Sequence, residues 1–367
     1  MSYRRKVGIA LLIVIVAIAA AWGASRLVRE PVARVTAKWS ASPHADRGAE
    51  AFTHWNEDDP AAIPANCARC HSLNGYLDYL GEDGSAAGTV DAEAPVGSVL
   101  YCNTCHSESA HALTQVTFPS QATVTGLGLE ANCMTCHQGT AAGSRVAGAT
   151  ADLPDDEVSP DLGFVNVHYA VAAGTQMGTE SGIAYEYPGR TYAGRYTHFA
   201  GLETCIQCHD PHSLEIDPQT CSPCHLSVTD EEDLADIRSG APDYDGDGDT
   251  RESVAAEIAA LHERLYAAIQ IYAAAQATPI VYAPGSYPYF MNDTDGDGQA
   301  DADEVNGGNA YASWTPRLLR AAYNYHYIQE DGGAYAHNAQ YAAQVLYDSI
   351  ADLAAVADVD TAGLARP

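Results

Sequence analysis

Basic residues are scarce in this chain of 367 residues. It contains 18 Lys and Arg against 48 Asp and Glu, only Lys6 and Lys38 are lysines, and the formal net charge is −30. A surface of this sign repels phosphate groups, so we expect no nucleic-acid partner and no anionic lipid surface as a partner. The length allows two or three domains.

Cysteine is absent outside one pattern. The ten Cys form five Cys-x-x-Cys pairs, and His follows the second Cys of each pair. In chain order, motifs 1 to 5 are Cys67, Cys70 and His71; Cys102, Cys105 and His106; Cys133, Cys136 and His137; Cys205, Cys208 and His209; Cys221, Cys224 and His225. No Cys is left over, and none lies near the N-terminal apolar run, which excludes a lipoprotein anchor.

This pattern is the attachment site of haem c. The two thiols add to two vinyl groups of the porphyrin, and the His ligates the iron. Zinc ribbons and redox dithiols also use Cys-x-x-Cys, but they do not require His after every pair. The sequence therefore predicts five covalently bound haem c groups, with zinc sites or disulfides as the alternatives.

With these motifs the chain resembles the multihaem c-type cytochromes. Residues 205–225, which hold two motifs with Pro-His after the first, resemble the doubled-motif type. The resemblance implies electron transfer but names neither donor nor acceptor. In doubled-motif cytochromes the second His ligates a neighbouring haem, and that role falls to His212.

The motifs begin 35, 31, 72 and 16 residues apart. So little chain per haem cannot form an ordinary core, so the porphyrins must supply buried apolar surface. We expect a mainly α fold with extensive irregular loops and very little sheet. A haem-stacked pentahaem module would span residues 31–228, with a helix near residues 46–56 before motif 1 and short helices after the motifs.

Each iron needs a second axial ligand or an open face. Only four Met occur, and Met177 and Met291 are the two that can serve, whereas nine of the 14 His lie outside the motifs. Closure of most irons by two His is the economical interpretation, and it implies low potentials. The predicted distal ligands are His44, His54, His168, His198, His212 and His337. We expect His111 to be solvated and His262 to lie on the surface.

Residues 229–367 lack Cys and carry two acidic loops. The second loop matches a twelve-residue calcium loop at every ligand position, with Asp293, Asp295, Asp297, Gln299 (by its carbonyl), Asp301 and Glu304. The first begins in the same way with Asp243, Asp245, Asp247 and Asp249, but its twelfth residue is Val254. Glu252 or Glu257 would have to replace the missing Glu. Structural calcium is the prediction, and a solvated acidic turn is the alternative.

Helices surround these loops. Apolar periodicity predicts helices from residue 253 to 275, from the N-cap Thr315 to residue 329, and from residue 338 to 357. The third faintly resembles the C-terminal helix of the nitrite reductase and hydroxylamine oxidoreductase group. There a His near such a helix can ligate haem, which implies that role for His337. Residues 229–367 are therefore predicted to form a helical calcium-binding domain rich in Tyr and Ala.

Residues 1–30 form an export or anchoring segment. A basic start at residues 4–6 precedes an apolar run over residues 7–22. A cleaved signal peptide would use the small residues 19–21, whereas an anchor would end at Trp22 with Arg26 at the interface. The following arginines favour the anchor. Either way, the rest of the chain is expected outside the cytoplasm, facing the periplasm or the exterior.

Three functions compete. The first is a membrane-anchored cytochrome that relays electrons between redox proteins, which would dock through a basic patch on the partner. The second is a multi-electron reductase of the nitrite or hydroxylamine type with one open haem, although no motif carries the Lys that many pentahaem nitrite reductases have in place of His. The third is a subunit of a polymeric cytochrome wire. The carrier is the preferred interpretation.

Overall fold

The computed structural model describes residues 31–238 and 242–367. These residues are mostly helical, with many loops and three two-stranded antiparallel sheets. The predicted mainly α fold with little sheet is thus confirmed at this level. The apolar run at residues 7–22 lies outside the described residues. Within the described ranges, no helix combines the length and apolarity needed to cross a membrane.

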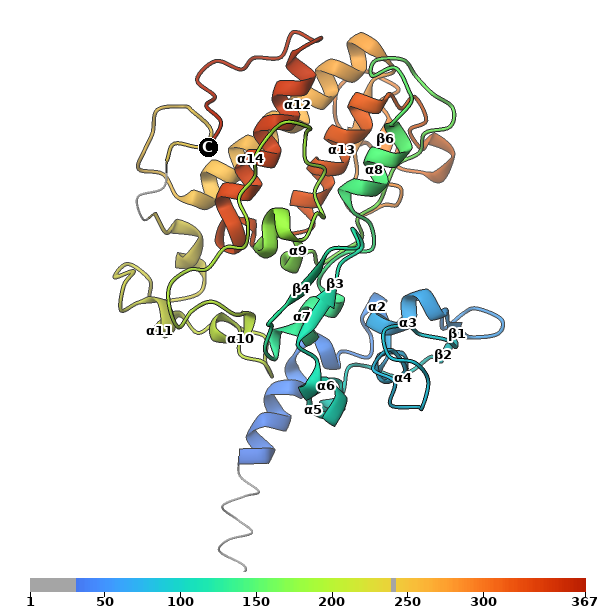
Figure 1. The fold of residues 1–367 in the computed structure, drawn as a ribbon. Helices are drawn as coiled ribbons and strands as arrows, with labels where there is room; N and C mark the ends of the chain where they lie inside the picture. Colours follow the sequence, from blue (N-terminus) through green and yellow to red (C-terminus); the bar gives the residue numbers. More distant parts are fainter. Residues whose placement is uncertain (1–30, 239–241) are drawn as a thin grey trace, which may run out of the picture. The chain divides into compact units, whose positions relative to one another are not determined.

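The chain forms two compact units (Figure 1). Of the described residues, the first unit contains 31–109 and the short segment His209–Ile216, and the second contains the others. Their boundaries do not follow the change of composition near residue 229. The border also falls inside motif 4, between Cys208 and His209.

The first unit is built from short elements. Residues 31–41 are helical. They are followed by η1 (Pro43–Ala45), α2 (Glu50–Thr53), β1 (Ala62–Ile63), α3 (Ala65–His71), α4 (Leu73–Tyr79), β2 (Ala94–Pro95), α5 (Cys102–His106) and the start of α6 (Glu108–Ala112). Among its described residues, Ile63, Ala68 and Ala94 form a small buried apolar cluster.

The helix expected near residues 46–56 is shorter than predicted. Only α2 is α-helical there. The Asp46 Oδ1 atom accepts the Gly48 N–H at 2.9 Å, a local turn that competes with the helix before α2 begins. Periodicity of apolar residues cannot detect such a turn.

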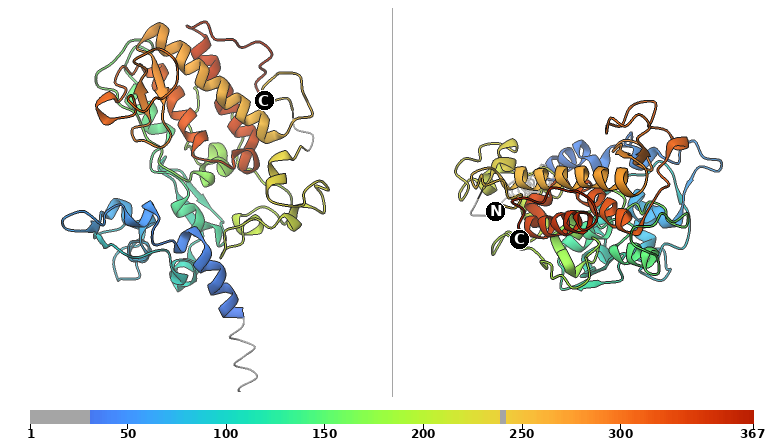
Figure 2. Two further views of the ribbon diagram at one scale, coloured as in Figure 1. Left: turned by 180° about the vertical axis from the view of Figure 1, so that it is seen from behind. Right: turned by 90° about the horizontal axis from the view of Figure 1, so that it is seen from above.

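The second unit has one large core. Its smaller elements are β3 (Gln115–Thr117), β4 (Thr123–Thr125), α7 (Glu130–Cys136), α8 (Gly143–Thr150), α9 (Ala172–Met177), η2 (Gly178–Glu180), α10 (Cys205–Cys208), α11 (Pro218–Cys221), η3 (Glu232–Asp236), β5 (Ile280–Tyr282), β6 (Phe290–Asn292) and η4 (Gly307–Asn309). Its three long helices are α12 (Val254–Gln276), α13 (Pro316–Gln329) and α14 (Ala334–Ala354). These three pack on one another, as Figure 2 also shows from behind.

The long helices follow their sequence signals closely. The Ser253 side chain accepts the Ala256 N–H at the start of α12, and Thr315 accepts the Leu318 N–H at the start of α13. Both predicted helices are confirmed. The third begins at Ala334, four residues earlier than predicted. Asn338 has a non-helical backbone there, and its Oδ1 caps the Tyr341 N–H, so the predicted start is a kink inside α14.

Gly143, the first residue of α8, lies against the backbone of Ala184 and Tyr185. An added Cβ would lie 2.1 Å from the Ala184 carbonyl oxygen, whereas at Gly148 of the same helix it would meet nothing within 4 Å. Gly143→Ala should therefore lower the free energy of unfolding by about 3 kcal/mol. Gly148→Ala, the matched control, should raise it by about 0.8 kcal/mol. Urea unfolding measures both, and equal midpoints for the two variants would contradict this close packing.

Candidate functional site

All five motifs lie on or beside short helices. Motifs 1 and 2 close α3 and α5, motif 3 closes α7 with His137 as the C-cap residue, and motif 4 forms α10. In motif 5, Cys221 ends α11. One helical turn places residues three apart on the same face, so the two thiols of a motif on a helix can approach one edge of a porphyrin together. None of the ten Cys forms a disulfide, and each is partly or fully exposed.

Thiols of different motifs approach one another in the second unit. Helix α7 packs against α10. A hydrogen bond between the Cys133 and Cys205 thiols lowers the pKa of Cys133 and raises that of Cys205. Burial raises the pKa of Cys208, and the nearby Cys221 raises it further. Motif 4 therefore contacts motif 3 at Cys205, and its Cys208 lies within electrostatic range of Cys221 in motif 5.

Two of the predicted proximal His have the ring orientation that a haem ligand would need. The His71 Nδ1 atom lies 2.7 Å from the Ala51 carbonyl oxygen, and the His209 Nδ1 atom lies 3.2 Å from that of Leu214. A hydrogen bond from Nδ1–H to a carbonyl fixes the ring and leaves Nε2 for a metal. The residues present therefore fit haem c in both thiol placement and imidazole orientation.

Two of the predicted distal His lie beside proximal His. The ring of His212 is parallel to that of His106, with centroids 6.1 Å apart. The centroid of His198 lies 6.0 Å from that of His225, and the Tyr196 hydroxyl lies 3.2 Å from His198 Nδ1.

His337 pairs with the carboxylate of Asp331. Its Nδ1 atom lies 2.7 Å from Asp331 Oδ1. Burial lowers the pKa of His337, but the Asp331 carboxylate more than offsets this, so the pKa lies above its usual value. A carboxylate on Nδ1 orients the ring and makes Nε2 a more basic ligand.

The other three predicted distal His are placed differently. His54 is exposed and its Nδ1 atom lies 2.9 Å from Glu50 Oε1. His44 is half-buried, which lowers its pKa, and its carbonyl accepts the Leu100 N–H just before motif 2. His168 is half-buried with a positive φ of 72°. The neighbouring Val167 carbonyl accepts the Thr140 N–H just after motif 3.

His262 is not the surface residue that the sequence suggested. Its ring stacks face to face on Tyr325 at 4.0 Å, and its Nε2 lies 2.9 Å from the Tyr325 carbonyl oxygen. Burial lowers its pKa to about 4. The charged neighbours Glu263 and Arg264 do not make His262 a surface residue, because successive side chains of a helix point in directions about 100° apart. His111, by contrast, is exposed as expected.

The two acidic loops share one hydrogen-bond pattern. In the second loop Asp293 accepts the Gly296 and Gly298 N–H groups at 2.7 and 3.0 Å. In the first, Asp243 accepts those of Gly246 and Gly248 at 2.6 and 3.0 Å. Gly298 and Gly248, at position six of each loop, have positive φ, as a calcium loop requires at that turn. The loops therefore share a backbone form that suits calcium.

The structure gathers some of the predicted calcium ligands. Ligand atoms of Asp293, Asp295 and Asp297 lie within 4.8 Å of one another, and this group does not include Asp301 or Glu304. Glu304 is 3% exposed, with Oε1 held by the Thr294 N–H and hydroxyl and Oε2 buried without a hydrogen-bond partner. Carboxylate crowding, above all by Asp297, raises the pKa of Asp301.

The two Glu residues that could replace the missing twelfth ligand of the first loop have different surroundings. Glu257 is fully buried, and its carboxylate accepts bonds from Arg238 and from the N–H groups of Tyr244 and Asp245. Glu257 also clusters with Asp243 and Asp245, but its oxygens are already occupied, whereas Glu252 clusters with Asp245 and Asp247 and its Oε1 is buried without a partner. Burial and the neighbouring carboxylates raise the pKa of Glu252. Asp249 lies outside these clusters and contacts Arg251.

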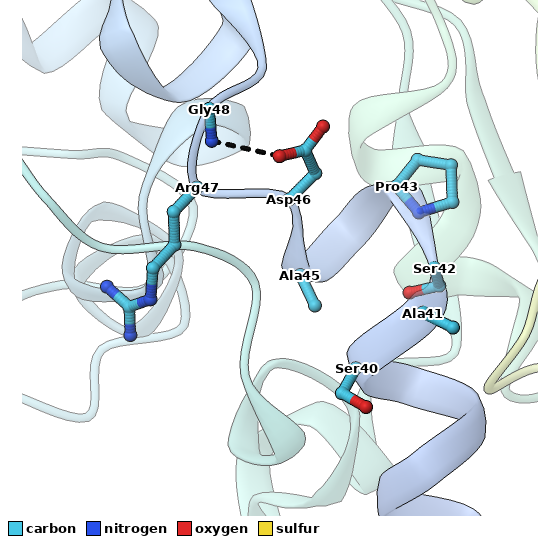
Figure 3. Close-up of a pocket in the computed structure, with 8 residues that line it drawn as sticks. All are labelled: Ser40, Ala41, Ser42, Pro43, Ala45, Asp46, Arg47 and Gly48. Carbon is cyan, nitrogen blue, oxygen red and sulfur yellow. Dashed lines mark hydrogen bonds between the residues drawn. The ribbon is translucent and has the colours of Figure 1, made fainter.

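Two features were missed from the sequence. Asp78, Asp83 and Asp91 form a further acidic cluster in the first unit. A hollow beside η1 is lined by residues 40–48 apart from His44, and none of the predicted attachment or ligand residues lines it (Figure 3). Neither carries a sequence motif that would have revealed it.

The polyheme c-type cytochromes OmcB and OmcC of Geobacter sulfurreducens are relatives of this chain. OmcB is 28% identical over 365 residues, covering 83% of this chain and 46% of OmcB. OmcC is 26% identical over 366 residues, covering 83% of this chain and 44% of OmcC. The chain thus spans less than half the length of these curated relatives. No family model matches the sequence, and no solved structure does. The chain is a distant homologue of polyhaem c-type cytochromes.

Proposed function

We propose that this chain is a pentahaem c-type cytochrome that relays electrons between redox proteins outside the cytoplasm. Haem c supplies one-electron chemistry. The observation that carries the proposal is the packing of motif 4 on motif 3, where α10 contacts α7 and the Cys205 and Cys133 thiols are hydrogen-bonded. Groups attached to these thiols would lie next to one another, and closeness is what electron transfer between them requires.

The charge of the chain supports a protein partner. With a net charge of −30, the chain would attract a redox protein that presents a basic patch. Such steering weakens as salt screens the charges. The anchor proposed at residues 7–22 would hold the cytochrome at a membrane, with the rest facing the periplasm or the exterior.

Calcium at the two acidic loops belongs to the same proposal, as a structural ion. The buried, unpartnered oxygens of Glu304 and Glu252 support it, because a buried carboxylate oxygen without a partner is costly. In the first loop we propose Glu252, with Asp245 and Asp247, as the ligand set that replaces the missing twelfth residue.

Intact mass of the exported protein tests the haem count. We expect five haem additions per chain and no free thiol. Cys67→Ala combined with Cys70→Ala should remove one addition, because motif 1 would then lack both attachment points. Bound zinc together with fewer than five haems in the unaltered protein would contradict the proposal.

A further inference from the structure

Two pairs of imidazole rings have the separation expected of two axial ligands on one iron. His106 and His212 have centroids 6.1 Å apart and planes 9° apart, and His198 and His225 have centroids 6.0 Å apart and planes 49° apart. A first-row metal bonds an imidazole nitrogen at about 2 Å, so two rings on opposite sides of one ion have centroids roughly 6 Å apart. A direct face-to-face stack is shorter, as His262 on Tyr325 shows with 4.0 Å.

The loop that carries His212 is fastened within the first unit. The Asp210 Oδ1 atom accepts the N–H groups of His212 and Ser213, both at 2.9 Å. Lys38 Nζ donates to the other Asp210 oxygen at 2.6 Å. Next to Lys38, the Trp39 indole N–H donates to the Leu100 carbonyl at 2.9 Å, just before motif 2. The helix over residues 31–41 thereby links the His212 loop to motif 2.

The segment that carries His198 is fastened in the second unit. The Tyr196 N–H donates to the Gln176 carbonyl of α9 at 2.8 Å. The Tyr196 hydroxyl then meets His198 Nδ1 at 3.2 Å. A hydrogen bond at Nδ1 leaves Nε2 as the ligand atom.

We propose that His212 is the second axial ligand of the motif 2 haem and His198 that of the motif 5 haem, with Tyr196 positioning His198. This assignment rests on the proposed function, because it requires haem at both motifs. In each pair, a proximal His meets a distal His that lies outside its own motif. With haem bound, the nearly parallel planes of the first pair and the twisted planes of the second would give the two irons different ligand fields.

The experiment counts high-spin irons by electron paramagnetic resonance in the full holoprotein. His212→Ala should convert one low-spin iron to high-spin, and added imidazole should restore it. The motif 2 knockout, Cys102→Ala with Cys105→Ala, should carry four haems by mass. Adding His212→Ala to that knockout should produce no high-spin iron, because the haem that His212 ligates is gone. One high-spin iron there would overturn the assignment of His212.

His198 is tested in the same way with a motif 5 knockout, Cys221→Ala with Cys224→Ala. His198→Ala should add no high-spin iron in this knockout but one in the motif 2 knockout, which is the matched control. The opposite pattern would overturn the assignment. Tyr196→Phe should leave the iron low-spin and raise its midpoint potential, since His198 becomes a weaker donor. An unchanged potential would remove Tyr196 from the proposal.

A second measurement covers knockouts that fail to fold. The low-spin signal lost in His198→Ala should have the larger maximum g value, because its ligand planes are twisted, and the signal lost in His212→Ala the smaller. Loss of the same signal by both variants would overturn the pairing. Fewer than five haems in the unaltered protein would instead contradict the proposed function and not the pairing alone.

Discussion

Glu257→Ala should lower the free energy of unfolding by about 3–5 kcal/mol, with or without calcium. Its carboxylate is fully buried, accepts the N–H groups of Tyr244 and Asp245 at 2.6 and 3.0 Å, and pairs with Arg238. Removing it leaves a largely buried guanidinium without its charge partner and two backbone donors without their acceptor. Glu263→Ala, at an exposed position on the same helix, is the control and should change stability by less than about 0.5 kcal/mol.

Glu252→Gln, unlike Glu257→Ala, should lower the stability of the protein only when calcium is present. Without calcium it should leave stability unchanged or slightly raised, because it removes one charge beside Asp245 and Asp247. With calcium at 100 times the dissociation constant, it should lose the stabilisation of about 2.7 kcal/mol that the ion gives at one site. Denaturant unfolding with added calcium or a chelator, together with the bound-calcium count, measures both effects. A Glu252→Gln protein that binds as much calcium as the unaltered protein would contradict the ligand set.

The sequence predicted the helix starts and loop turns that depend on interactions between residues close together in the chain. Ser253 and Thr315 cap α12 and α13 where the sequence places them, because a cap needs only its own first turn. The acidic loops likewise take their turn form from residues within the loop. By contrast, the choice between Glu252 and Glu257 depends on Arg238, which lies outside the loop and reaches Glu257.

The sequence could not predict which residues far apart in the chain come into contact in the candidate site. The five motifs name every attachment residue, but not the iron that each distal His would reach. That depends on contacts such as Lys38 with Asp210, which are 172 residues apart. The prediction that His262 lies on the surface was wrong for the same reason, because its stacking partner Tyr325 lies on another helix. His326, which no motif marks, is buried between Tyr282 and Asn166, which lie 2.9 Å from its two ring nitrogens.

The spin state of the irons should separate a carrier from a reductase. An iron closed by two His is low-spin and leaves no face for a small substrate, whereas a reductase must keep one face open. The imidazole pairs at motifs 2 and 5 and the Asp331-backed His337 favour closure. We therefore expect five low-spin irons, low midpoint potentials, and no spectral shift with nitrite, hydroxylamine or carbon monoxide.

The His212→Ala protein is the positive control for this expectation. It should bind carbon monoxide at one iron, with a spectral change close to one fifth of that for a fully open pentahaem chain, while its mass keeps all five haems. His111→Ala, which replaces an exposed His, should bind none. One stoichiometric high-spin iron in the unaltered protein would contradict the carrier function. The open iron would then belong to a motif without a distal His, and the reductase would become the better interpretation, because an open iron is the one feature that a pure carrier does not need.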